Sequence, residues 1–388
     1  MPRPRLIYLC NAVDEATARQ RGITTDSPAA TQKVLQVLRA MKGSRLAPVA
    51  LSLARGRQQG SGRRHAATVR RVEGVAVVYA PFWDWPILTH LVSCLALLPL
   101  AARLARRRRG SILLAYNRLP YWWPVLEAAR WLGLHAFLDL EDGELASAGP
   151  LKRWFIRRQD ALCRAGAVLA AAPIGRFYAG RRTICCHGLA ETLTPFRPPA
   201  GPVLVHFGGT LMPGTGSELL ASTIELLRGR DPAVPLRFVI TGTGPGAGRL
   251  QALDQPDVWP AVEFRGKVSR SDYDTILRQA QVSLALKLCD SGFGETTFPS
   301  KVIEIAAAGL ALVTTPISDV PWLFGPDGAF YVEEETPAAL AALFTLIARD
   351  PATLAAVART GQERIVAECN PAVLGRRLEE FFLDSPPS

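Results

Sequence analysis

Residues 286–318, LKLCDSGFGETTFPSKVIEIAAAGLALVTTPIS, constrain the fold more than any other stretch of the chain. Their pattern predicts a polar loop over 290–300, followed by a short helix over 301–308. Gly309 ends that helix, and an apolar strand follows over 310–314. A loop that opens a helix after a strand offers backbone N–H groups and the positive end of a helix dipole, both of which favour a phosphate-bearing ligand.

Two polar side chains in the first turn of this predicted helix have the chemistry of a nucleotide site. Lys301 and Glu304 lie three positions apart, so they share one face of the helix. The ammonium can meet a phosphate, and the carboxylate can accept two hydroxyls of a ribose or a sugar. The alternative is a solvated surface ion pair, because such pairs are common and weak.

Strand and helix patterns alternate along the chain, which predicts an α/β protein with parallel sheets. With 388 residues, 48% of them hydrophobic, the chain can bury two cores. The segment 194–202, TPFRPPAGP, is rich in proline and glycine and predicts a domain boundary. The segment 55–71 is rich in Arg, Gly and Gln and predicts a mobile surface loop. A dinucleotide cofactor is disfavoured, because no G-x-G-x-x-G follows the first predicted strand.

The segments FPSKVIEIAAAGLALVTT and GPDGAFYV resemble the donor-site signature of GT-B glycosyltransferases, in particular the retaining family 4 and its neighbours. The loop 208–216, the turn GTGPG and the strand VEFRGKV resemble further elements of that family, so that the resemblance covers about residues 203–345. It implies a GT-B fold, in which two Rossmann-like doubly wound domains face each other across a cleft. Residues 1–195 would then bind the acceptor, 203–365 would bind the nucleotide sugar, and 366–388 would form a helix that crosses back to the first domain.

The resemblance also implies roles for particular residues. Glu304 matches the family glutamate that binds the ribose of the donor. The first acidic residue of the family pattern falls at Thr296, or at Ser291 if the segment SGFG is matched to the family's Glu-Gly-Phe-Gly. The family's arginine and lysine, which meet the donor diphosphate, match Thr210 and Thr215, so other cations must neutralise it. Lys301 is predicted to stabilise the leaving diphosphate, with Lys287, Arg265 and Lys267 as further candidates. The predicted donor-binding residues are Gly208, Gly209, Thr210, Gly242, Gly244, Lys287, Thr296, Ser300, Lys301 and Glu304.

A second acidic cluster follows the predicted strand over 136–140. Glu141 lies where the family has a histidine in the catalytic cleft. Because the carboxyl ends of parallel strands face the ligand crevice, Glu141 or Asp142 is predicted to act as general base for an acceptor hydroxyl. Capping of the following helix, or pairing with nearby arginines, is the alternative.

Charge divides the chain into two unlike halves. Residues 1–200 contain 30 Lys and Arg against 12 Asp and Glu, whereas the remainder contains 15 against 22. A basic first half suits anionic lipid headgroups or a phosphate-linked acceptor. Nucleic acid is disfavoured, because no aromatic residues interleave the cations and no known module is present. The segment 87–109 is apolar up to 102 and then arginine-rich, so a core helix, an interfacial membrane helix and a spanning helix remain open.

These observations predict a hexosyltransferase-type glycosyltransferase that moves a sugar from a nucleotide-sugar donor to a glycan or polyprenyl-linked acceptor in polysaccharide biosynthesis. The donor is a substrate, no cofactor is expected, and the resemblance implies independence of metal. Seven cysteines without a C-x-x-C, and no signal peptide, predict a location in the cytoplasm or at the inner face of the cell membrane, with peripheral contact through 87–109. The alternatives are a nucleotide-sugar 2-epimerase and a non-catalytic GT-B subunit of a membrane glycosylation complex.

Overall fold

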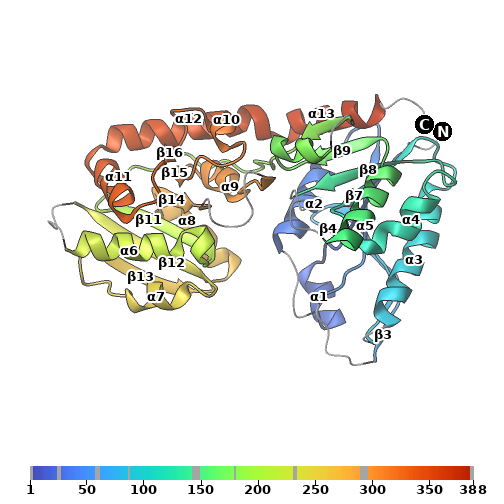
Figure 1. The fold of residues 1–388 in the computed structure, drawn as a ribbon, viewed down its shortest axis with the longest axis horizontal. Helices are drawn as coiled ribbons and strands as arrows, with labels where there is room; N and C mark the ends of the chain where they lie inside the picture. The colour runs from blue at the N-terminus through green and yellow to red at the C-terminus, as the bar shows by residue number, and fades with distance from the viewer. Residues whose placement is uncertain are drawn as a thin grey trace. The chain divides into compact units, whose positions relative to one another are not determined.

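The computed structural model of the protein describes residues 3–23, 28–56, 62–85, 88–141, 149–178, 181–229, 234–288 and 296–384. The chain divides into two compact units (Figure 1). Unit 1 consists of Met1–Leu189 together with Pro371–Ser388, and unit 2 consists of Ala190–Asn370.

Unit 1 is built on an eight-stranded sheet with the order β10-β9-β8-β7-β1-β2-β5-β4. Neighbouring strands are parallel, except that β4 pairs antiparallel with β5. Central strands such as β1 are continuous apolar runs, as expected for parallel strands that are covered on both faces. The strands are β1 Arg5–Cys10, β2 Ala47–Ser52, β4 Thr68–Val72, β5 Val75–Tyr79, β7 Ser111–Tyr116, β8 Leu134–Leu140, β9 Gly166–Leu169 and β10 Thr183–Cys185.

The prediction of a surface loop over 55–71 is wrong for the second half of that segment. Strand β4 lies there and forms a hairpin with β5, while β3 Arg64–His65 pairs with β6 Phe82–Trp83 in a separate two-stranded sheet. The hairpin turn consists of Glu73 and Gly74, both with positive φ (47° and 76°), which is the geometry of a two-residue hairpin turn. Arginines on β4 are tolerated because it is an edge strand with one side in solvent.

The helices of unit 1 include one from the carboxyl end of the chain. Helix α13 (Pro371–Leu383) packs beside α2 (Pro28–Ala40), and both contribute to one hydrophobic core. Glycine is required at this contact, because a Cβ at Gly375 would lie 2.2 Å from the carbonyl oxygen of Ala40. The other helices are α1 Glu15–Arg21, α3 Leu88–Ala105, α4 Trp123–Ala128 and α5 Pro150–Leu162, with 3-10 turns η1 Pro120–Trp122 and η2 Ala172–Phe177.

Unit 2 is built on a six-stranded parallel sheet with the order β13-β12-β11-β14-β15-β16. From β11 the chain first adds strands on one side and then on the other, so the strand order reverses between β11 and β14. In open α/β sheets, ligands bind outside the carboxyl ends of the strands at such a reversal. The strands are β11 Val203–Thr210, β12 Leu236–Thr243, β13 Ala261–Gly266, β14 Val282–Ala285, β15 Ala311–Thr314 and β16 Phe330–Tyr331.

Helices cover both faces of this sheet. Helix α6 packs against α11, and their apolar side chains fill one core with the strands. Helix α12 packs against β15 and α9. The helices of unit 2 are α6 Ser217–Arg228, α7 Ala247–Ala252, α8 Arg270–Gln279, α9 Lys301–Ala307, α10 Val320–Phe324, α11 Pro337–Arg349 and α12 Pro351–Cys369, with the 3-10 turn η3 Pro213–Thr215.

The proline-rich segment 194–202 belongs to unit 2, because the division of the chain lies earlier, at Leu189–Ala190. The backbone of Thr194 is fixed at the end of α9: its N–H donates to Ala307 O (2.9 Å), and its carbonyl accepts from Gln362 Nε2 (2.8 Å). Among the described residues, no single helix has the length and hydropathy of a membrane span, although the bent pair Pro337–Arg349 and Pro351–Leu383 passes both criteria together.

Candidate functional site

Glycines line the carboxyl ends of β11 and β12 in unit 2. Gly208 and Gly209 pair in register with Thr241 and Gly242. A Cβ at Gly242 would lie 1.9 Å from Gly209 O, and one at Gly208 would lie 2.4 Å from Thr241 Oγ1. Side chains are therefore excluded from this edge of the sheet, and we refer to Gly208, Gly209 and Gly242 as the glycine edge.

Lys301, the first residue of α9, reaches the glycine edge. Its Nζ donates to Gly208 O at 2.6 Å and lies 1.7 Å from where a Cβ of Gly209 would stand. The residue is exposed overall, yet desolvation of its ammonium lowers the pKa of Lys301, and the nearby carboxylate of Glu304 opposes that shift. The structure thus brings together Lys301, Gly208 and Gly209, three of the predicted donor-site residues.

Glu304 lies one turn further along α9, with 35% of its side chain exposed. Its Oε1 accepts from Arg270 (3.0 Å), and its Oε2 accepts from the hydroxyl of Tyr273 (3.3 Å). Sequence reasoning missed both partners, which lie on α8. The sequence did hold one sign that Arg270 and Tyr273 act together. They lie three positions apart at the start of a helix, which places both side chains on one helical face.

Beneath this region lies His206, a buried polar residue within the apolar first part of strand β11, Val203–Phe207. Its Nδ1 contacts Ser283 Oγ at 2.9 Å, its Nε2 contacts Thr241 Oγ1 at 3.0 Å, and its ring meets Tyr273 edge-on. Burial, and then the charge of Lys301, lower the pKa of His206 to about 4. The imidazole is therefore neutral at physiological pH and acts as a fixed hydrogen-bonding support. Sequence reasoning missed this residue as well.

The loop after β11 is closed by its own threonines. Thr215 Oγ1 donates to Thr210 O (2.8 Å) and accepts the N–H of Met212 (3.0 Å), so the positions that match the family's cations here stabilise the loop. Gly244 packs against the same loop, since a Cβ on it would lie 2.2 Å from Leu211 O.

The remaining predicted donor residues lie around the start of α9. Lys287 Nζ donates to Thr297 Oγ1 at 3.0 Å. Thr296 immediately precedes that threonine, and Ser300 is the exposed residue before α9, whose side chain makes no capping hydrogen bond. Residues 289–295, which form most of the predicted polar loop, lie outside the described residues.

Glu141 follows β8 in unit 1 and takes part in a charged cluster. Lys33 of α2 forms ion pairs with Glu141 and, at 2.8 Å, with Asp139, which also accepts a hydrogen bond from Tyr8. Desolvation acts to lower the pKa of Lys33, but the two carboxylates outweigh it and raise that pKa. Sequence reasoning missed Lys33, which lies far from Glu141 in the chain. The other candidate base, Asp142, lies outside the described residues.

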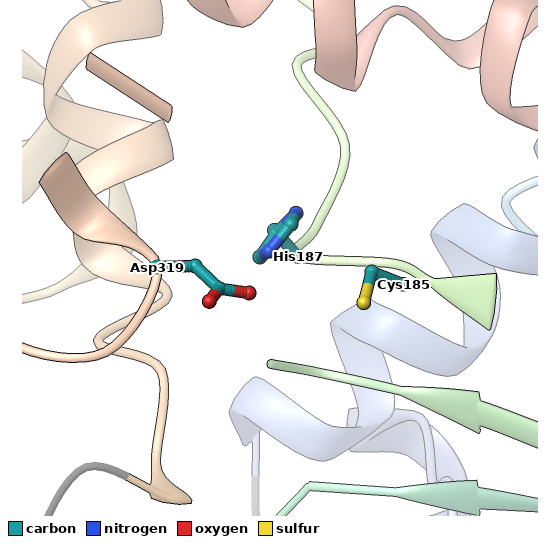
Figure 2. Close-up of side chains that lie close together, drawn as sticks. All are labelled: Cys185, His187 and Asp319. Carbon is teal, nitrogen blue, oxygen red and sulfur yellow. The ribbon is translucent and has the colours of Figure 1, made fainter. Parts of the chain in front are cut away.

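Figure 2 shows a cysteine and a histidine of unit 1, two residue types that commonly bind metal ions. They are Cys185 at the end of β10 and His187 just beyond it. Two such groups are fewer than the four ligands of a structural zinc site, and we assign no metal to them. Asp319 of unit 2, also labelled there, is the residue that precedes α10.

Known proteins resemble this chain in sequence and in fold. Residues 201–350 match the family model of group 1 glycosyl transferases. The glycosyltransferase WcaL of Escherichia coli K12, assigned to colanic acid biosynthesis, is 26% identical over 191 residues, which is 48% of this chain and 47% of WcaL. The match thus spans about half the length of this curated relative.

Solved structures resemble the whole chain. HepE from Anabaena in complex with UDP has a TM-score of 0.67 at 14% identity, over 97% of this chain and 98% of HepE. Sucrose-phosphate synthase from Thermosynechococcus elongatus has a TM-score of 0.68 at 15% identity, with the same coverage. TarM has a TM-score of 0.67 at 8% identity, again over 97% and 98% of the two chains.

The chain therefore has the GT-B fold, as its resemblance to that family predicted. Within this fold, residues 201–350 resemble a group 1 glycosyltransferase domain. The hypotheses of a 2-epimerase and of a non-catalytic subunit receive no support from these matches.

Proposed function

We propose that the protein is a glycosyltransferase, which transfers a sugar from a nucleotide-sugar donor bound by unit 2 to an acceptor bound by unit 1. One observation carries the proposal: Lys301 and Glu304 share one turn of α9, with the ammonium of Lys301 on the glycine edge. A cation beside closely approachable backbone suits a diphosphate, and a half-exposed carboxylate suits the hydroxyls of a ribose. HepE, a neighbour in fold, has been solved with UDP and with UDP-glucose.

The chemistry follows from where charge develops. As the bond between sugar and diphosphate breaks, negative charge grows on the leaving phosphate, and preorganised donors at that position lower the barrier. Lys301 is the stabiliser that we assign to this charge, which is why we propose a reaction independent of metal. In unit 1, Glu141 is our candidate for the general base that accepts the proton of the acceptor hydroxyl. Its carboxylate lies at the end of β8, where it forms an ion pair with Lys33 of α2.

The donor that we propose carries a hexose, and the acceptor is a glycan or a polyprenyl-linked glycan of polysaccharide biosynthesis. The assignment of WcaL to colanic acid biosynthesis supports this choice of process. We further propose that the protein acts at the cytoplasmic face of the membrane, with α3 as its contact. Leu91 and Leu95 of this helix are 56% and 57% exposed, and the arginine run 106–109 follows its end. A helix that exposes apolar side chains and is followed by cations suits an anionic lipid surface.

A screen of donors tests the proposed function. Purified protein is titrated calorimetrically with UDP, GDP and their hexose conjugates, and the release of nucleotide is then followed with and without EDTA. We expect one nucleotide class to bind and its sugar to be released or transferred equally well in EDTA. Binding of none of these nucleotides would favour the non-catalytic subunit, whereas inversion at C2 of the bound sugar without transfer would favour the epimerase.

A further inference from the structure

We propose that Arg270 and Tyr273 of α8 orient the carboxylate of Glu304 and thereby make the donor site select ribonucleotides over 2′-deoxyribonucleotides. This inference rests on the proposed function, since it assigns the donor's ribose to Glu304. Arg270 and Tyr273 act through Glu304 and are positioning residues. We refer to the two side chains together as the α8 clamp.

The α8 clamp donates one hydrogen bond to each carboxylate oxygen of Glu304. Within the described part of the chain, Arg270 donates to Oε1 and Tyr273 donates to Oε2, so each oxygen of Glu304 has one donor there. An ionised carboxylate offers about four lone-pair sites, two on each oxygen. One site on each oxygen therefore remains for a ligand, and 35% of the side chain is exposed to receive it. Two adjacent hydroxyls, such as the 2′ and 3′ hydroxyls of a ribose, match this pair of acceptors.

The α8 clamp is itself held in place. Arg270 Nε pairs with Asp274 one turn along the helix (3.0 Å), and its guanidinium lies 5.5 Å from the centre of the Tyr273 ring. The Tyr273 ring also packs edge-on against His206, with 5.5 Å between ring centres. Because His206 is fixed by hydrogen bonds to β12 and β14, the orientation of Glu304 is tied to the central strands of the sheet.

The α8 clamp also keeps two opposite charges apart. Lys301 and Glu304 lie three positions apart on α9, a spacing at which a lysine and a glutamate pair readily. By holding Glu304, Arg270 leaves Lys301 on Gly208 O, where it can meet a phosphate. Burial, and then the charge of Glu304, raise the pKa of Tyr273, so its hydroxyl remains a donor throughout the physiological range.

Paired nucleotides test the inference. Dissociation constants are measured for UDP and 2′-deoxy-UDP, and for GDP and 2′-deoxy-GDP, with the wild type, Arg270→Gln and Tyr273→Phe. Arg278→Gln is the matched control, because Arg278 also lies exposed on α8. We expect the wild type and the control to prefer the ribonucleotide about ten- to hundredfold, the effect of one hydrogen bond to a charged group. In both clamp variants the preference should fall to within about threefold, with the affinity for the deoxynucleotide unchanged.

This pattern separates a positioning role of the clamp residues from a general structural role. Loss of a general structural role would weaken the binding of both nucleotides of a pair equally. An unchanged preference in both clamp variants, or an equal loss for both nucleotides, overturns the inference while the proposed function stands. If the wild type binds none of the four nucleotides, the proposed function fails and the inference fails with it.

Discussion

Lys301 is the residue on which the charge balance of the donor site depends. The family's two phosphate-binding cations are replaced by Thr210 and Thr215, which here bond to the loop itself. We expect Lys301→Ala to lower turnover about a hundredfold or more while weakening nucleoside binding less, because it removes one preorganised stabiliser of developing charge. Lys301→Arg should recover only part of the lost turnover. The planar guanidinium of arginine does not fit where the compact ammonium of Lys301 fills the space of a Gly209 Cβ. Steady-state kcat and KM measure both effects.

Arg359→Ala serves as the control for Lys301→Ala, because Arg359 is an exposed cation on a helix of the same unit. Near-normal turnover in Lys301→Ala, combined with loss of turnover in Arg265→Ala or Lys287→Ala, would place the phosphate site on another loop. The structure gives each of these alternatives a local partner, Glu263 for Arg265 (2.7 Å) and Thr297 for Lys287 (3.0 Å).

At the residue scale, the sequence was informative where neighbours along the chain share a site. Lys301 and Glu304 could be predicted together because helical spacing places them on one face. The contacts of Arg270, Tyr273 and Lys33 could not, since these residues meet Glu304 or Glu141 only through the packing of helices that lie far away in the chain. His206 was equally hidden, because a single polar residue in an apolar strand reveals its partners only when the neighbouring strands are paired.

Helix α3 is part core and part surface. Leu97 and Ala101 are buried, whereas Leu91 and Leu95 are exposed. We expect the protein to float with anionic vesicles at low salt and to be released at high salt, since the arginine run contributes a screened attraction. The double variant Leu91→Ser, Leu95→Ser should bind these vesicles more weakly, which flotation measures.

Leu346→Ser is the matched control, because Leu346 is a similarly exposed leucine (53%) on α11 of unit 2. Flotation of this control should equal that of the wild type. Absence of the wild type from the vesicle fraction at low salt would leave α3 as an ordinary helix of unit 1.

Elements with strong periodicity could be predicted closely from the sequence. The helix expected over 301–308 is α9, Lys301–Ala307, and the strand expected over 310–314 is β15, Ala311–Thr314. The hairpin of β4 and β5 was missed, because its turn is Glu73-Gly74 and its arginine-rich edge strand resembles a solvated loop. Edge strands carry little of the buried alternation by which strands are found in a sequence.

At the scale of the whole molecule, the two units differ in charge and in candidate role. The basic residues concentrate in the first half of the chain, which forms most of unit 1, while the candidate donor site lies within unit 2. In unit 2 the glycine edge, Lys301 and Glu304 gather near the strand-order reversal between β11 and β14, where open α/β sheets bind ligands. We therefore expect unit 2 to bind a nucleotide through α9 and the glycine edge.

Calorimetric titration of Glu304→Gln is the decisive experiment for this mode of nucleotide binding. The ligand is UDP or GDP, whichever the donor screen selects, and Glu334→Gln is the control because Glu334 is an exposed carboxylate of the same unit. The wild type and Glu334→Gln should bind alike, and Glu304→Gln should bind about ten- to hundredfold more weakly, as expected when a charged hydrogen-bond acceptor is lost. Equal affinity of Glu304→Gln and the wild type, with equal turnover, would contradict the account.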